Sequence, residues 1–176
     1  MLVKILMGVA VVVVALAAYV ATRPSEFSVS RTASFAAPAP LVFAQVNELR
    51  KWRAWSPWAK KDPQAKETFE GPAAGAGASM SWAGNNEVGE GRMTIVESRP
   101  AEVVRFKLEF FKPFAATNSA EFAFKEEGGR TAVTWTMRGQ NNFVGKAMCL
   151  VFDMDKMVGG DFAAGLAGIK AIVEKK

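Results

Sequence analysis

The residues that could carry chemistry in this chain are few, and three aspartates near its carboxyl end form the most obvious group. Asp153, Asp155 and Asp161 are separated by two and six positions, so one face of a helix cannot hold all three. The chain contains no histidine and a single cysteine, Cys149, which leaves no zinc site of the usual ligands and no histidine-dependent triad. We therefore expect no catalytic residue, no metal and no cofactor, and we interpret Asp153 as the cap of a C-terminal helix.

Other polar residues admit a functional interpretation and a simpler structural one. Glu90 and Glu109 are the carboxylates that an enzyme built on this chain would use, but no second titratable group is expected beside them on an inward face. Asn118, Asn141 and Asn142 could contact a ligand near the ends of strands. Asparagine is common in turns, however, because its side chain hydrogen-bonds the nearby backbone. We therefore interpret the three asparagines as turn residues.

The charge of the chain does not point to a nucleic-acid partner. Its 22 basic and 17 acidic residues give a net charge of +5. Lys4 and Arg23 flank an N-terminal apolar segment, and the other charges are spread along the chain without a dense basic run. The glycines of the segment 84–91 lie between expected strands rather than before a helix, so they do not form a phosphate-binding loop. We expect no nucleic-acid partner.

The N-terminal segment is apolar on every side, which indicates a helix in a membrane rather than in a protein core. Residues 2–21 contain one charge, Lys4, and a membrane-spanning helix needs about 20 apolar residues. A cleaved signal peptide is the alternative, with a passable cleavage site at Ala15-Leu16-Ala17, but the apolar run continues past that site. We predict a retained single-pass anchor at 1–24 and one domain at 25–176. The short stub before the anchor favours an extracytoplasmic or periplasmic domain.

Alternation of apolar and polar side chains predicts a series of strands after the anchor. The clearest segment is 103–110, where Val104, Phe106 and Leu108 alternate with charged residues. Glycine- and proline-containing turns separate the segments. The expected strands are 27–35, 67–70, 78–83, 88–98, 103–110, 116–125 and 130–138, and two short helices are expected between the first two strands, at 41–49 and from there to about residue 56.

From Phe143 onward the apolar spacing becomes helical, with a break near Asp153 or Asp155. The last part is the only element long enough to cover the apolar face of the strands. We therefore predict an α+β fold, with a curved antiparallel sheet of about six to seven strands around one long C-terminal helix. The residues that recur at steps of three and four on the buried face of this helix are Val158, Phe162, Leu166, Ile169 and Val173.

A pocket lined by methionine and aromatic side chains is expected between the sheet and this helix. Flexible methionines and rigid rings together suit an apolar ligand. Glycines at 159, 160, 165 and 168 thin the helix, so we expect the facing surfaces to leave space. The tryptophans of the short helices could instead seal those helices onto the sheet. The expected ligand-binding wall consists of Trp55, Trp58, Met80, Trp82, Met93, Phe106, Phe122, Trp135, Met137, Phe162 and Leu166.

Several local motifs lie at the junctions of the expected elements. They are the Ala37-Pro38-Ala39-Pro40 entry to the first helix, the segment Trp52–Trp58, the segment Gly89–Met93 followed by Glu97–Pro100, the corner Lys112-Pro113-Phe114, and the strand Thr131–Met137 before the long helix. With the order of elements, they resemble the helix-grip fold of the SRPBCC superfamily, which includes START-like lipid carriers and polyketide cyclase/dehydrase-like proteins. The resemblance covers about residues 25–176 and is strongest to the membrane-anchored bacterial branch. None of the motifs is a catalytic signature.

The expected cavity and the resemblance together favour binding of a lipid or another apolar small molecule without identifying it. We predict a membrane-tethered, non-enzymatic binding protein, whose tether keeps the pocket at the bilayer where such ligands reside. Two alternatives stay open. One is a cyclase or dehydratase that uses Glu90 or Glu109, and the other is a ligand-free structural or interaction module of the cell envelope.

Overall fold

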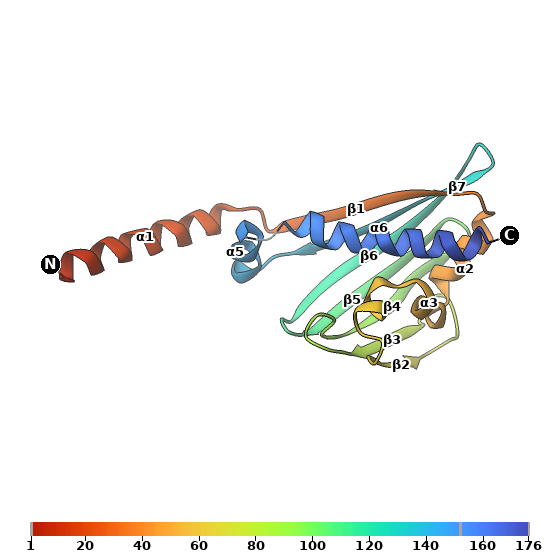
Figure 1. Ribbon diagram of the computed structural model, residues 1–176, viewed down its shortest axis with the longest axis horizontal. Helices are drawn as coiled ribbons and strands as arrows, with labels where there is room; N and C mark the ends of the chain where they lie inside the picture. Colours follow the sequence, from red (N-terminus) through yellow and green to blue (C-terminus); the bar gives the residue numbers. More distant parts are fainter. Residues whose placement is uncertain (1, 152, 176) are drawn as a thin grey trace.

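A computed structural model describes residues 2–151 and 153–175 of the chain. Met1 and Lys176, the outer ends of the two expected segments, lie outside the described residues. The first helix, α1 (Leu2–Thr22), projects away from the rest of the molecule (Figure 1). Its 21 residues make a helix about 32 Å long, which matches a hydrocarbon core of about 30 Å. Within the described part of the chain, α1 is the one helix long and apolar enough to cross a membrane.

Seven strands form one open antiparallel sheet, as the alternating segments predict. The strand order is β1-β7-β6-β5-β4-β3-β2. Strands β2 to β7 form a meander in chain order, and β1 is the edge strand beside β7. Each expected strand is present, with ends shifted by at most two residues. The strands are β1 (Glu26–Phe35), β2 (Lys66–Glu70), β3 (Ser79–Ala83), β4 (Glu90–Arg99), β5 (Val103–Lys112), β6 (Ala116–Glu127) and β7 (Arg130–Gln140).

The register of the strands shows which end of the sheet faces α1. Glu26, the first residue of β1, lies opposite Gln140, the last residue of β7. At the same end the turn between β5 and β6 pairs Phe110 with Ala116. Only Arg23, Pro24 and Ser25 separate α1 from β1. This end of the sheet carries the start of β1, the end of β7 and the β5–β6 turn. We call it the α1 end of the sheet.

Helices fill the inner face of the sheet and its margins. Three short ones follow β1: α2 (Ala39–Asn47), α3 (Trp52–Trp55), reached through the 3₁₀ turn η1 (Leu49–Lys51), and α4 (Pro57–Lys61). Helix α4 was not predicted from the sequence, although Pro57 at its first position has the backbone angle that a helix start needs. Two helices follow β7, namely α5 (Phe143–Val151) and α6 (Met154–Val173). The backbone N–H of Lys156 donates to the Asp153 carboxylate, so the expected cap of the last helix is confirmed.

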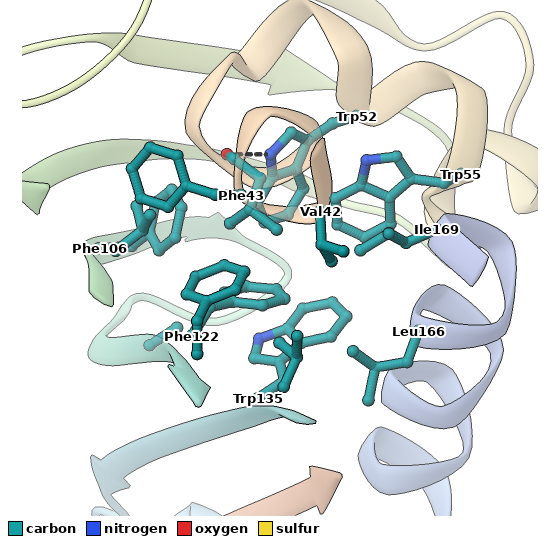
Figure 2. Close-up of a cluster of buried hydrophobic side chains, with 14 of the residues drawn as sticks. Val42, Phe43, Trp52, Trp55, Phe106, Phe122, Trp135, Leu166 and Ile169 are labelled. Carbon is teal, nitrogen blue, oxygen red and sulfur yellow. Dashed lines mark hydrogen bonds between the residues drawn. The ribbon is translucent and has the colours of Figure 1, made fainter. Parts of the chain in front are cut away.

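The long helix α6 lies along β1 (Figure 1). Its apolar face packs on aromatic rings of the sheet. The indole of Trp135 stacks on Phe162 of α6, with ring centroids 4.0 Å apart, and on Phe122 of β6 at 4.5 Å. Figure 2 shows Trp52 and Trp55 of α3 on the other side of this cluster, with the Trp52 N–H bonded to the carbonyl oxygen of Val46. The packed interior is therefore dense around α3, α6 and the middle of β6 and β7.

The glycines of α6 bring neighbours closer and do not open space, contrary to the expectation from the sequence. A Cβ at Gly165 would lie 2.8 Å from the Trp135 ring, and one at Gly168 would lie 2.7 Å from the Trp55 carbonyl oxygen. At Gly159 a Cβ would collide with the Arg31 guanidinium. Gly160 faces open space. Three of the four glycines are thus sites of close approach, because the surrounding side chains are large enough to fill the room that glycine leaves.

Candidate ligand cavity

A cavity of about 810 Å³ opens between the inner face of the sheet and the helices α3, α4, α5 and α6. Its volume lies within the range of about 300–1,000 Å³ that is typical of small-molecule sites. The strands β3 to β7 supply one wall, and Trp58, Val158 and Phe162 supply part of the other. The cavity runs toward the α1 end of the sheet, where the β5–β6 turn and α5 border it.

Most of the residues expected to form the ligand-binding wall line this cavity. Alternation along each strand points them to the inner face, where the sheet is covered by helices. Trp52, Leu108 and Phe110, which were not among the expected wall residues, line it as well. Leu108 and Phe110 share the inner face of β5 with Phe106, so the same alternation predicts them, and Trp52 shares the short helix α3 with Trp55. The expected residues that line the cavity are Trp58, Met80, Trp82, Met93, Phe106, Trp135, Met137 and Phe162.

Three expected wall residues, Trp55, Phe122 and Leu166, do not line the cavity. They belong to the dense part of the interior and are each at most 1% exposed. Trp135 stacks on Phe122, and Trp55 packs against Gly168 with its N–H bonded to the carbonyl oxygen of Gln45 at 3.1 Å. Neighbouring side chains therefore occupy the space beside these three residues, and a ligand in the cavity would not contact them.

Two polar atoms are buried without a hydrogen-bond partner among the described residues, and both belong to side chains that line the cavity. They are the indole nitrogen of Trp135, a donor, and the amide oxygen of Asn118, an acceptor. Leaving such a group unpaired costs about 1–3 kcal/mol. Asn118, interpreted from the sequence as a turn residue, lies within β6 opposite Gly139, whose missing side chain makes room for the amide. Both unpaired atoms are fully buried, so they lie inside the packed wall and not on the surface that the cavity exposes.

The charged groups around the cavity are paired. Glu67 lies 3.7 Å from Arg53, and Asp161 lies 2.7 Å from Lys61. Glu67 was not predicted to line the cavity, although it shares a strand face with Phe69, two positions along β2. These pairs form a polar margin on the helix side of the cavity.

The carboxylates considered for catalysis lie elsewhere. Glu90 and Glu109 pair with Lys112 and Lys107, at 2.7 Å and 2.6 Å, and neither lines the cavity.

The three C-terminal aspartates do not form a common site. Asp155 forms a 2.8 Å ion pair with Arg31 of β1, and the hydrogen bonds from that guanidinium lower the pKa of the Asp155 carboxyl. The backbone N–H of Lys156, followed by its side chain, lowers the pKa of Asp153. Within residues 2–151 and 153–175, no group of histidine, cysteine, aspartate and glutamate side chains could hold a metal ion.

Exposed apolar side chains frame the mouth of the cavity. Phe114 in the β5–β6 turn is 65% exposed, and Val144 and Met148 of α5 also line the cavity while remaining exposed. Asn141 and Asn142, interpreted as turn residues, lie in the connection to α5 and border the same opening.

A family model described as "Polyketide cyclase / dehydrase and lipid transport" matches residues 26–174. Among solved structures, the di-domain ARO/CYC protein BexL from the BE-7585A biosynthetic pathway has a TM-score of 0.62 and 17% identity, over 89% of this chain and 53% of that chain. The hypothetical protein jhp0584 from Helicobacter pylori has a TM-score of 0.63 and 10% identity, over 84% of this chain and 88% of that chain.

Protein CV1439 from Chromobacterium violaceum has a TM-score of 0.59 and 12% identity, over 85% of this chain and 98% of that chain. At such identities these structures share the fold with this chain. No curated protein matches the sequence.

Proposed function

The chain belongs to the family described as polyketide cyclase / dehydrase and lipid transport, and from that premise we propose that it is a membrane-tethered, non-enzymatic binder of a lipid or other apolar small molecule. Family membership also confirms the resemblance to the SRPBCC superfamily inferred from the sequence. The observation that carries the proposal is the 810 Å³ cavity, whose wall is built from aromatic and methionine side chains. Burial of apolar ligand surface against such a wall supplies the affinity, at about 25 cal/mol per Å².

The lining of the cavity narrows the chemistry of the ligand. Its wall consists mainly of aromatic, methionine and other apolar side chains, so we favour a ligand that is apolar over most of its surface. Cationic ligands fit less well, because each carboxylate at the margin already has a basic partner.

The proposal assigns separate roles to the two segments of the chain. Residues 1–24 act as the single-pass anchor, and residues 25–176 act as the binding domain on the extracytoplasmic side of the membrane. A length of about 32 Å and an apolar composition support the first assignment. The tether would keep the cavity at the surface from which an apolar ligand is drawn.

Catalysis is the alternative function, and the geometry supports it less well. The cavity-lining carboxylates Glu67 and Asp161 are engaged by Arg53 and Lys61. General acid–base catalysis needs a titratable group within hydrogen-bond reach of the reacting atoms. Both cavity-lining carboxylates are held in ion pairs, so neither is a free acid or base beside a bound ligand.

Chemical extraction of the purified full chain tests the proposal. We expect mass spectrometry to find an apolar molecule that co-purifies in about one copy per chain. The variant Ala120→Trp should lose it, because Ala120 lines the cavity between Phe106 and Met137 on the neighbouring strands. Ser119→Trp is the matched control, since Ser119 is the adjacent residue on the outer face of β6. Equal amounts of the molecule in both variants would place it outside the cavity and contradict the proposal.

A further inference from the structure

Helix α5 is apolar and yet has no buried residue among its nine. Phe143 is 51% exposed and Val151 is 77% exposed, and Leu150 is exposed with them. On a helix, Leu150, Phe143, Val151, Val144 and Met148 fall on one continuous arc, because successive residues are turned by about 100°. Exposed apolar surfaces of this kind mark contacts with a membrane or with another protein.

The contacts of α5 favour the membrane, because α5 packs on the C-terminal end of α1 (Figure 1). Val20, near that end, is 3% exposed, whereas every other residue of α1 except the half-buried Ala17 is exposed. Lys146, the one charged residue of α5, places its ammonium 3.4 Å from the carbonyl oxygen of Ala21. Basic side chains are favourable at this end of a helix, where backbone carbonyls lack partners.

Residues at the end of α1 mark the level of the membrane surface. The Arg23 guanidinium lies over the Tyr19 ring, 5.6 Å from its centroid. Tyrosine and arginine side chains concentrate at the boundary between hydrocarbon and water. Since α5 contacts α1 at the same level, its apolar arc lies at that boundary.

The connection from α1 to the sheet is too short to move the cavity away from the bilayer. Three residues separate Thr22 from Glu26 and reach about 10 Å when fully extended. The sheet end reached in this way carries the β5–β6 turn with Phe114, which frames the cavity mouth together with α5. The α5 side of the mouth therefore lies beside the end of α1, and the Phe114 side lies at the same end of the sheet.

We propose that α5, together with Phe114, docks into the lipid headgroup region and holds the mouth of the cavity against the bilayer. The partner is the lipid surface itself, and the docked arrangement gives an apolar ligand a path between bilayer and cavity that does not cross water. The docking of α5 rests on the proposed membrane anchor, and this last step rests on the proposed binding function as well. Short apolar helices lying in the membrane plane bury one face by about 5–10 Å.

Lipid-borne quenching of a fluorophore measures the docking in the full chain. The protein is placed in vesicles of phosphatidylethanolamine and phosphatidylglycerol that carry a nitroxide-labelled lipid. In a Cys149→Ser background, a fluorophore is attached at Val151→Cys on α5 or, as the control, at Lys125→Cys. Lys125 is an exposed residue near the opposite end of β6. We expect strong quenching at position 151 and little at position 125.

A second pair of substitutions separates docking from anchoring and from ligand binding. Phe143→Ser with Leu150→Ser removes two large side chains of the apolar arc that do not line the cavity. Each loss should weaken docking about tenfold or more. Quenching at position 151 should fall, while α1 still keeps the chain in the membrane fraction. Binding of a fluorescent fatty acid in detergent should stay unchanged, because the cavity wall is intact.

The outcomes for docking and for ligand binding are distinguishable. Equal quenching at positions 151 and 125, or quenching at 151 that survives the double substitution, overturns the docking of α5 whatever the cavity binds. Docking that is observed in a chain that binds no fatty acid upholds the membrane contact but removes the proposed path for a ligand.

Discussion

Replacing Phe122 by alanine tests whether the interior is packed as described. Phe122 is 0% exposed, stacks on Trp135 at 4.5 Å and meets Phe106 edge-on at 6.0 Å. Phe-to-Ala changes in a packed core cost about 3–5 kcal/mol. For a domain of this size each kcal/mol lowers Tm by about 2–4 °C, so Tm should fall by roughly 6–20 °C. Phe111→Ala is the matched control, because Phe111 is 55% exposed, and it should change stability by at most about 0.5 kcal/mol.

The assay is urea and thermal unfolding of the full chain in detergent micelles, followed by circular dichroism and repeated with a fluorescent fatty acid present. Phe122→Ala should unfold early with or without the fatty acid. From sequence alternation alone, Phe122 is expected in the ligand-binding wall. If it lay there, Phe122→Ala would change the affinity for the fatty acid and leave the free energy of unfolding nearly unchanged. Unfolding midpoints that are equal for Phe122→Ala and Phe111→Ala would refute the packing described for the interior.

Further predictions follow from α6 and its contacts. Gly168→Ala should destabilise the chain by about 1–3 kcal/mol, because its Cβ would press on a backbone oxygen of α3. Gly160→Ala, facing open space, should instead stabilise it by about 0.5–1 kcal/mol. Urea midpoints that move in the same direction in both variants would contradict the close packing described at Gly168. The lowered pKa of Asp155 means that its pair with Arg31 favours the folded state at neutral pH, and that this contribution is lost as the pH falls through the lowered pKa. Asp155→Asn should therefore unfold earlier than the parent at pH 7 and together with it at low pH; a difference that persists in acid would show that the charge is not the cause.

The sheet could be predicted from the sequence because its signal is local. Alternation of apolar and polar residues placed every strand to within two residues, and a steric rule of period two needs no knowledge of distant partners. The long helix was equally accessible, since Val158, Phe162 and Leu166 recur at helical spacing. The cap at Asp153 follows from local hydrogen bonding and was predicted correctly.

Which of the expected wall residues border the cavity could not be predicted, because this depends on how rings from distant parts of the chain pack together. Trp135 of β7 fits between Phe122 of β6 and Phe162 of α6, and no sequence spacing reports that arrangement. The glycines of α6 looked like vacant space, yet they allow indole rings and backbone to approach. The exposure of α5 was also hidden, since a mostly apolar segment of nine residues looks the same in the sequence whether it is buried or exposed.

Titration of the delipidated full chain with a fluorescent fatty acid tests the central claim most directly. We expect saturable binding with one site per chain, which Ala120→Trp abolishes and Ser119→Trp leaves unchanged. Both variants should unfold near the parent's midpoint. Binding that does not saturate, or that persists in the Ala120→Trp variant, would contradict the claim that the space between sheet and helices is a ligand site.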